Sequence, residues 1–313
     1  MTIWKVLITD GLSDKGIAIL SANAQVDNKP DISADDLLQE VGDYDAMVVR
    51  GRTKVTAAVF EAAKKLKVVG RAGVGVDNID LSAARLHQVT VVNSPKATSL
   101  AVAELALGMM FALARSLPKA DAGMKQGQWL KKQLKGIELN GKTLGIVGMG
   151  NIGTAIAQRA ASLGMKVVGY DTLVPPEEIR KRGGEPVDLS ELYAQSDFIT
   201  FHLPLTPESK GMVNGQSFAM MKPGVRIVDA ARGGIIDETA LLAALEQGQV
   251  AGAALDVYAS EPPGLTALVA HPNVVATPHM GAQTAEAQDR AAQDIASEVM
   301  AALQGETLRW KIV

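Results

Sequence analysis

The sequence contains no cysteine and no block of like charge. Without cysteine, structural disulfides, thiolate catalysis and zinc–thiolate sites are excluded, and no other pattern in the sequence predicts a bound metal. The 31 basic and 34 acidic side chains give a formal net charge of −3. Because these charges are dispersed along the chain, we expect no nucleic acid partner.

The sequence also lacks targeting signals and long apolar runs. Its first residues have neither the apolar core nor the small-residue cleavage site of a signal peptide. The longest apolar stretch, residues 99–117, contains Glu104 and is rich in alanine. We therefore expect a buried or interface helix there and no membrane association. A cytoplasmic location is the default expectation.

Short apolar segments alternate with helical patterns along the 313 residues, a length that allows two domains. In the first part of the chain, strands are expected at 5–9, 45–49 and 67–70, and helices at 33–41 and 57–66. This alternation predicts a parallel sheet covered by helices.

The pattern restarts after residue 140, with strands expected at 142–148, 166–171, 197–203, 225–231 and 252–257. The last expected helix, 283–303, has no strand partner of its own. Its simplest use is to cross back and complete the first domain, with the 99–117 helix as the other crossing. The sequence therefore predicts an α/β fold made of two doubly wound parallel-sheet domains.

A glycine-rich turn, Gly148-x-Gly150-x-x-Gly153, lies between an expected strand and an expected helix. Gly148 would form the tight turn, Gly150 would let a pyrophosphate approach the backbone, and Gly153 would let the helix pack on the strand. The helix N-terminus would supply N–H groups for the phosphates. Asp171, which ends the next strand, would bind the adenosine ribose and repel the extra phosphate of NADP. We therefore predict NAD, with other adenosine cofactors and a purely structural turn as alternatives.

Three charged or titratable residues, Arg232, Asp256 and His279, follow apolar strands near the end of the second domain. Open α/β sheets bind ligands at the carboxyl ends of their strands. There, a histidine is suited to acid–base work, Glu261 could fix its tautomer, and an arginine could bind a carboxylate in bidentate fashion. Each residue alone also has an ordinary structural interpretation. The joint arrangement behind a dinucleotide loop favours catalysis.

Several motifs in order, GMGNIG with Asp171, HLPLTPES, DAARGGIID, ALDVYASEPP and TPHMGAQT, resemble those of the D-2-hydroxyacid dehydrogenase family. RAGVGVDNIDL (71–81) and VVNSP (91–95) are more similar to its phosphoglycerate dehydrogenase branch. The resemblance covers essentially the whole chain. It implies a Rossmann-type NAD-binding domain, residues 98–282, inserted into a flavodoxin-like substrate-binding domain, residues 1–97 and 283–313, with a cleft between them.

The resemblance also implies a catalytic set. Arg232 would hold the substrate carboxylate and polarise the carbonyl, His279 would move the hydroxyl proton, and Glu261 would pair with His279. The implied cofactor-binding residues are Val74, Gly148, Gly150, Asn151, Ile152, Gly153, Asp171, His202, Leu203, Pro204, Ala230, Ala231, Arg232, Asp256, His279, Gly281 and Ala282.

Substrate binding is implied for two loops of the first domain, whose backbone N–H groups and positive charge would meet carboxylate and phosphate. The implied residues are Arg50, Gly51, Arg52, Thr53, Gly73, Val74, Gly75, Arg232 and His279, with Lys131 contributed by a partner subunit. Gly51, Val74 and Lys131 depart from the serine, threonine and arginine that are frequent in the phosphoglycerate dehydrogenase branch.

The function implied by the resemblance is NAD-dependent oxidation of D-3-phosphoglycerate to 3-phosphohydroxypyruvate, in serine biosynthesis, by a homodimer formed through the cofactor domain. One alternative is a reductase of glyoxylate, hydroxypyruvate or another small 2-keto acid. An alternative of a different class is a corepressor-like protein that senses NAD. The chain stops soon after the crossing helix, so we expect no C-terminal regulatory domain and no feedback control by serine.

Overall fold

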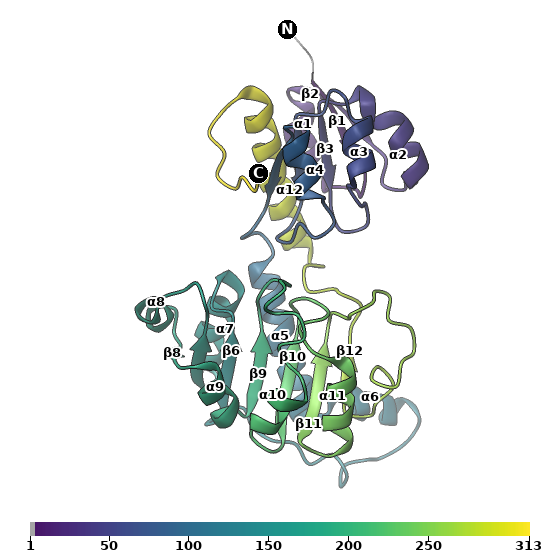
Figure 1. Cartoon of the computed structure of the whole chain (residues 1–313). Helices are drawn as coiled ribbons and strands as arrows, with labels where there is room; N and C mark the ends of the chain where they lie inside the picture. Colours follow the sequence, from purple (N-terminus) through teal and green to yellow (C-terminus); the bar gives the residue numbers. More distant parts are fainter. Residues whose placement is uncertain (1–3) are drawn as a thin grey trace. The chain divides into compact units, whose positions relative to one another are not determined.

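The computed structural model describes residues 4–313 and divides the chain into two compact units (Figure 1). Unit 1 consists of Met1–Ser99 and Ala282–Val313, and unit 2 consists of Leu100–Gly281. The sequence-based expectation for the inserted segment is 98–282, so the observed unit lies within the expected one.

Unit 1 contains a five-stranded parallel sheet with the order β2-β1-β3-β4-β5. Its strands are β1 Trp4–Ile8, β2 Ala24–Asn28, β3 Ala46–Val49, β4 Val68–Arg71 and β5 Thr90–Asn93. Three of them, β1, β3 and β4, coincide with predicted strands. The sequence does not predict β2, because AQVDN is polar and no residue of this edge strand is fully buried.

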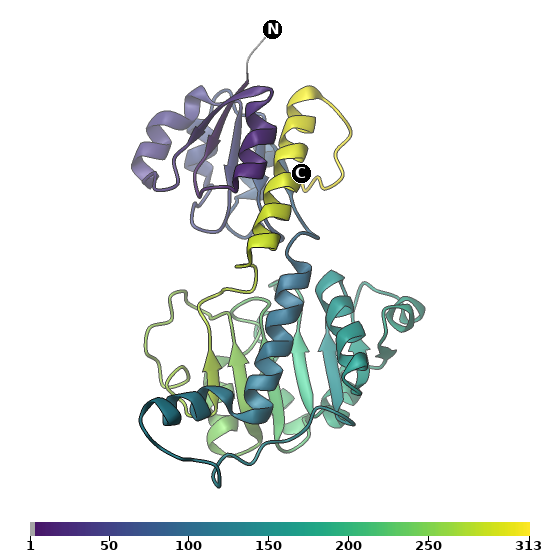
Figure 2. The ribbon, with the colours of Figure 1, turned by 180° about the vertical axis from the view of Figure 1, so that it is seen from behind.

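Helices cover both faces of this sheet (Figures 1 and 2). On one face, α1 Asp14–Ser21 and α12 Ala285–Gln304 form a core with the strands. On the other face lie α2 Ala34–Glu40, a short 3-10 turn Val41–Asp43, α3 Ala57–Ala62 and α4 Leu81–Leu86. The helix that follows unit 2 in the sequence thus packs in unit 1.

Unit 2 contains a seven-stranded parallel sheet with the order β12-β11-β10-β9-β6-β7-β8. Its strands are β6 Thr143–Val147, β7 Lys166–Tyr170, β8 Glu185–Pro186, β9 Phe198–Phe201, β10 Val225–Asp229, β11 Val250–Leu255 and β12 Val274–Ala276. The chain starts at β6, runs outward to β8, and then returns to the other side of β6. This reversal is the switch point of a doubly wound sheet, so the predicted fold class is confirmed.

The helices of unit 2 also form two layers (Figures 1 and 2). One face of the sheet packs against α5 Ser99–Arg115 and α7 Asn151–Ser162, with α8 Pro176–Lys181 at its side. The opposite face packs against α9 Leu189–Gln195, α10 Gly215–Met220 and α11 Glu238–Glu246.

The helix predicted at 99–117 is interrupted in the structure. Ser116 has a φ of 50°, in the left-handed region, so α5 ends at Arg115 and α6 runs from Leu117 to Lys125. Within residues 4–313, no single helix is long and apolar enough to cross a membrane, although α5 and α6, bent by 65°, pass that test together. Pro118, at the start of α6, is the signal in the sequence that is consistent with this break.

Candidate active site

The turn after β6 shows why glycine occupies its three marked positions. Gly148 has a φ of 99°, and a side chain there would meet the His202 carbonyl at 2.3 Å. A Cβ on Gly153 would lie 2.1 Å from the Gly148 carbonyl, whereas a Cβ on Gly150 would have nothing within 4 Å. Gly148 and Gly153 therefore serve the fold, and Gly150 leaves open space beside the backbone. A phosphate needs such space to approach the N-terminus of α7.

Asp171 follows β7 and holds this turn in place. One carboxylate oxygen accepts the N–H of Met149 at 2.7 Å. The other accepts the N–H groups of Leu173 at 2.7 Å and Val174 at 3.1 Å. A carboxylate has about four acceptor positions, so capacity for a further donor remains. The half-buried acid thus both fixes the glycine turn and can bind a hydroxyl beside it.

His202, after β9, is held as a neutral side chain. Its Nε2 lies 2.7 Å from the Thr200 hydroxyl, and its Nδ1 is buried without a hydrogen-bond partner among residues 4–313. Burial lowers the pKa of His202 to about 3. Because the ring stays uncharged near neutral pH, this histidine is unsuited to acid–base exchange at that pH. The next residues, Leu203 and Pro204, are partly exposed and exposed respectively.

His279 and Glu261 form a hydrogen-bonded pair near the carboxyl edge of the same sheet. The His279 Nδ1 lies 2.7 Å from Glu261 Oε2, and the two side chains are 50% and 37% exposed. An ionised carboxylate can only accept, so Nδ1 carries the hydrogen and donates it. This leaves Nε2 as the nitrogen that can exchange a proton with another molecule. The Tyr258 N–H, at 3.1 Å, fixes the second oxygen of Glu261.

The turn that carries His279 is anchored on Asp256. This carboxylate is 1% exposed and accepts the Thr277 hydroxyl at 2.6 Å and the N–H groups of Met280 and Gly281 at 2.8 Å each. These hydrogen bonds fix the backbone on both sides of His279. The φ of His279 is 52°, which is uncommon for a residue other than glycine. Such conformations persist where the surroundings enforce them and are frequent at functional sites.

Arg232 follows β10 and begins the loop Arg232-Gly233-Gly234. One of its Nη atoms donates to the Ala231 carbonyl at 2.6 Å. A Cβ on Gly233 would lie 1.7 Å from the Tyr258 carbonyl. The loop is therefore pressed against the segment that leads to Glu261, and only glycine fits there.

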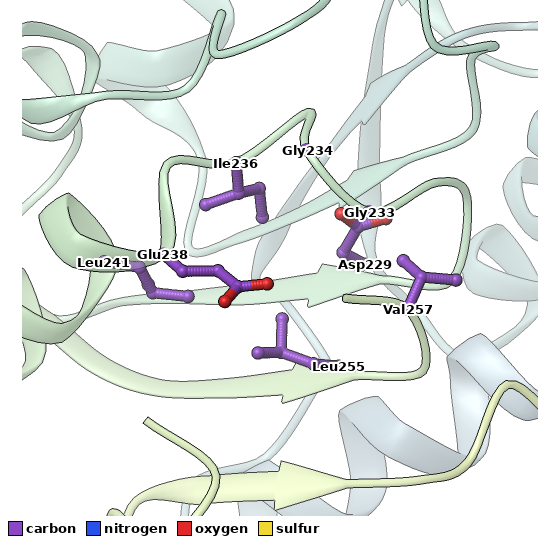
Figure 3. A pocket seen from close by; sticks show the side chains of 8 residues that line it. All are labelled: Asp229, Gly233, Gly234, Ile236, Glu238, Leu241, Leu255 and Val257. Carbon is purple, nitrogen blue, oxygen red and sulfur yellow. The ribbon is translucent and has the colours of Figure 1, made fainter. Parts of the chain in front are cut away.

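Asp229, at the end of β10, lies behind that loop. Burial raises its pKa to about 7, against the opposing effects of the Ala231 N–H and of Arg232. Asp229 and Glu238 both line a cavity of about 10 Å³ (Figure 3), roughly the room that one water molecule needs. The cavity is too small for a substrate.

In unit 1, the loop Arg50–Thr53 follows β3 and is braced by Asp10, the residue two positions after β1. Asp10 accepts the N–H of Arg50 at 2.7 Å, the N–H of Thr53 at 3.2 Å and the Thr53 hydroxyl. Its side chain is only 4% exposed. A buried carboxylate needs such partners. It also has a counter-ion, because the Arg52 guanidinium lies 3.3 Å away.

Arg52 is already engaged by neighbouring backbone. Its guanidinium donates to the carbonyls of Ile32 at 3.0 Å, Pro30 at 2.6 Å and Thr9. The Arg50 side chain, in contrast, has no hydrogen bond or ion pair within the described residues. Of the two arginines expected to bind substrate, Arg50 is the one with unused donors.

The structure brings the predicted residues together in two groups. The parallel strands of unit 2 place one group at or near the carboxyl edge of their sheet: Gly148, Gly150, Asn151, Ile152, Gly153, Asp171, His202, Leu203, Pro204, Ala230, Ala231, Arg232, Asp256, Glu261, His279 and Gly281. The other group, in unit 1, contains Arg50, Gly51, Arg52, Thr53, Gly73, Val74, Gly75 and Ala282. Lys131 lies in an exposed turn after α6.

Asp10 is absent from the sequence-based set, because the Asp10-Gly11 pair has the composition of an ordinary turn. Its contacts with the Arg50–Thr53 loop span 40 and 43 residues. One signal was present: an acid directly after the first strand of a parallel sheet lies at the ligand-binding edge. Among residues 4–313, no group of three or more histidine, aspartate or glutamate side chains is arranged to hold a metal ion.

A family model described as D-isomer specific 2-hydroxyacid dehydrogenase, NAD binding domain, matches residues 107–281. The chain is 50% identical over 305 residues to a D-3-phosphoglycerate dehydrogenase of Pongo abelii and 47% identical over 303 residues to one of Methanocaldococcus jannaschii. These alignments cover 97% and 96% of this chain, but 57% and 58% of the relatives. The chain thus spans little more than half the length of these curated relatives.

Solved structures match over the full length. A Thermus thermophilus protein is 34% identical with a TM-score of 0.90, covering 99% of this chain and 100% of that one. A glyoxylate reductase from Paecilomyes thermophila is 31% identical with a TM-score of 0.89, covering 100% and 99%. The prediction of NAD as cofactor is confirmed at the level of the matching domain, which is described as NAD binding.

Proposed function

The chain belongs to the D-isomer specific 2-hydroxyacid dehydrogenases, and we propose that it oxidises D-3-phosphoglycerate to 3-phosphohydroxypyruvate with NAD, at the entry to serine biosynthesis. The observation that carries the chemistry is the 2.7 Å pair of His279 and Glu261, near the same sheet edge as the glycine turn. The substrate is proposed from the relatives that are named for it.

The proposed chemistry assigns one task to each side chain. His279 Nε2 takes the hydroxyl proton of the substrate during oxidation and returns it during reduction. Glu261, bonded to Nδ1, stabilises the imidazolium that forms. Arg232 binds the substrate carboxylate and polarises the neighbouring carbonyl. When bound, NAD supplies the acceptor for the hydride.

The residues at the glycine turn fit a dinucleotide. The space beside Gly150 admits a phosphate, and the N–H groups of Ile152 and Gly153 have no acceptor within residues 4–313. They belong to the first turn of α7, where such groups and the helix dipole favour an anion. Asp171 is placed to bind ribose hydroxyls and disfavours a further phosphate, which supports NAD over NADP.

Phosphate recognition depends on the positive charges of unit 1. Arg52 is bonded to Asp10 and to backbone carbonyls, so the charge for the phosphate comes from Arg50. Lys131, which the family resemblance assigns to a partner subunit, is a point charge rather than a fork. We propose that Arg50 carries phosphate recognition and that Lys131 adds to it.

A homodimer through unit 2 is part of the same proposal. Large apolar side chains are exposed on α5, α6 and the segment after them: Phe111 at 40%, Leu117 at 52%, Met124 at 58% and Trp129 at 76%. Large apolar side chains exposed along one segment are consistent with a protein interface, and two-fold dimers are the commonest assembly. We also propose a cytoplasmic location.

A second candidate is a reductase of unphosphorylated 2-keto acids. The glyoxylate reductase with a matching fold is covered to 99% by this chain, and the engagement of Arg52 removes one expected phosphate ligand. The two candidates share the chemistry of His279, Glu261 and Arg232.

NADH oxidation measured side by side with 3-phosphohydroxypyruvate, hydroxypyruvate and glyoxylate separates these candidates. We expect the highest kcat/KM with the phosphorylated substrate. Equal or better values without the phosphate would assign the chain to the second candidate. Failure to oxidise NADH with all three would refute the proposed function.

A further inference from the structure

Two backbone N–H groups of unit 1, those of Gly51 and Gly75, have no hydrogen-bond acceptor within the described chain, residues 4–313. Gly51 is exposed and Gly75 is partly exposed. They lie in the loops after β3 and β4, which are neighbouring parallel strands. Both donors therefore belong to the carboxyl edge of the five-stranded sheet, where ligands bind in such folds.

A buried asparagine holds the carbonyl on the opposite side of the first peptide. Asn78 is 8% exposed, and its Nδ2 donates to the Arg50 carbonyl at 3.0 Å and the Thr53 carbonyl at 2.7 Å. In a planar trans peptide, the carbonyl and the following N–H point in opposite directions. By fixing the Arg50 carbonyl inward, Asn78 turns the Gly51 N–H outward.

The second loop repeats this arrangement with another asparagine. Asn93 is 5% exposed, and its Nδ2 donates to the Val74 carbonyl at 2.7 Å. The same peptide carries the Gly75 N–H, which is turned away from Asn93. Ser94 N–H binds the Gly73 carbonyl at 2.9 Å, so the preceding peptide is fixed as well. In both loops, a buried asparagine side chain thus orients a peptide group by a hydrogen bond to its carbonyl.

We propose that Asn78 and Asn93 are positioning residues that direct the Gly51 and Gly75 N–H groups toward the anionic groups of the substrate. This inference rests on the proposed function, because it requires a substrate with a carboxylate or phosphate. Backbone donors fixed in advance lose no side-chain entropy on binding, and a bond to a charged acceptor is stronger than one to a neutral acceptor.

The kinetic test replaces each asparagine by alanine in the full chain. For Asn78→Ala and Asn93→Ala, we expect KM for 3-phosphohydroxypyruvate to rise about tenfold, roughly the effect of losing one hydrogen bond to a charged group. We expect kcat and KM for NADH to stay within about twofold of wild type. An unchanged KM for the keto acid in both variants would overturn the proposal.

Gln249→Ala is the matched control. The Gln249 Nε2 also donates to two backbone carbonyls, those of Phe218 and Met221 at 2.8 Å each, but it lies in unit 2, immediately before β11. Its loss should lower the melting temperature as the Asn78 change does, without raising KM for the keto acid. If Gln249→Ala raises that KM equally, the effect of Asn78→Ala is general destabilisation and the proposal fails.

A direct measurement covers the case in which Asn78→Ala does not fold. Amide resonances of Gly51 and Gly75 are followed in the wild-type chain during titration with D-3-phosphoglycerate, without cofactor. Both should shift downfield, and Gly215, a helix-start glycine of unit 2, should not. Unmoved Gly51 and Gly75 signals in an enzyme that turns over the keto acid would overturn the inference while leaving the function intact. Lack of turnover with every keto acid would refute the function separately.

Discussion

The two units present different chemistry at the same edge of a parallel sheet. In unit 1, Asp10, Asn78 and Asn93 hold the loops at the carboxyl ends of β3 and β4. Within residues 4–313, the N–H groups of Gly51 and Gly75 in these loops have no acceptor. In unit 2, the corresponding edge carries side chains that can exchange protons or bear charge, namely Arg232, Glu261 and His279. We therefore propose that unit 1 recognises the acid substrate and that unit 2 supplies the residues that react.

This difference follows from what each kind of donor can do. A backbone N–H has no side-chain freedom to lose and does not titrate, so it suits recognition of an anion. A histidine titrates near neutrality and can move a proton, but it needs a partner to fix its tautomer. The comparison therefore predicts that changes in unit 1 act on KM for the acid and changes at His279 act on kcat.

The largest effect is expected for His279→Ala. Removal of a general acid–base group lowers turnover by roughly 10²–10⁴-fold, and binding of NADH, followed by its fluorescence, should change little. His271→Ala is the control, because His271 lies before β12 instead of after it. Within residues 4–313, the one hydrogen bond of its ring is the one it accepts from the Asn273 N–H. If His279→Ala turns over as fast as wild type, His279 is not the general acid–base, and the proposal that unit 2 supplies this group is contradicted.

A smaller effect is expected for Asp171→Ala. Loss of a charged acceptor costs about 1.5–3 kcal/mol, so KM for NADH should rise roughly 10- to 100-fold, and the preference for NADH over NADPH should narrow. Asp188→Ala is the control, since Asp188 also accepts a backbone N–H, at 2.7 Å, but caps α9. A preference for NADH that survives the Asp171 change would show that another feature excludes NADP.

Arg50→Ala and Arg52→Ala should have different effects on the KM values of phosphorylated and unphosphorylated keto acids. The first should raise KM for 3-phosphohydroxypyruvate about tenfold more than KM for hydroxypyruvate, because it removes a charge-assisted bond to the phosphate. The second should raise both KM values equally and lower the melting temperature, because Arg52 neutralises Asp10. The sequence alone suggested that Arg52 binds the phosphate. A selective loss with the phosphorylated substrate in Arg52→Ala would restore that interpretation.

The last prediction concerns the pH dependence of the unfolding free energy, and it belongs to unit 2. The pKa of Asp229 is raised from 3.8 to about 7, so the folded state favours the protonated carboxyl. The stability that this group contributes is therefore fully present below pH 3.8 and is lost as the pH rises to about 7. The pKa of His202 is lowered from 6.5 to about 3, so its contribution is present above 6.5 and is lost as pH falls toward 3. Between about pH 4 and 6.5 the two contributions oppose each other.

Single variants should separate these two contributions. When the pH is lowered from 7.5 to 5, His202→Asn should lose less unfolding free energy than wild type, by up to about 2 kcal/mol. Asp229→Asn should lose more unfolding free energy than wild type over the same change of pH. The wild-type protein gains stability when the Asp229 carboxyl is protonated, and the variant has no such group. Denaturant unfolding at both pH values measures this. Deviations of the same sign would contradict the pKa shifts.

The sequence predicted most of the candidate site in unit 2, because the residues of that site occur in short local motifs. A glycine turn, an acid ending the next strand and polar residues after apolar strands all mark the carboxyl edge of a parallel sheet. Asp10 carries the same local signal, but its partners lie up to 43 residues away and are not visible in the local pattern. The roles of Asn78 and Asn93 likewise depend on contacts that span 28 and 19 residues. The break at Ser116 is a backbone feature, and the prediction of one helix over 99–117 did not take Pro118 into account.

The division between binding and reaction is tested most directly by single-turnover kinetics. The rate of NADH loss is measured against the concentration of 3-phosphohydroxypyruvate in wild type, Asn78→Ala and His279→Ala. We expect Asn78→Ala to reach nearly the wild-type rate at saturation, whereas His279→Ala should stay slow at every concentration. A slow Asn78→Ala at saturation, or a His279→Ala whose rate is restored by more substrate, would contradict it.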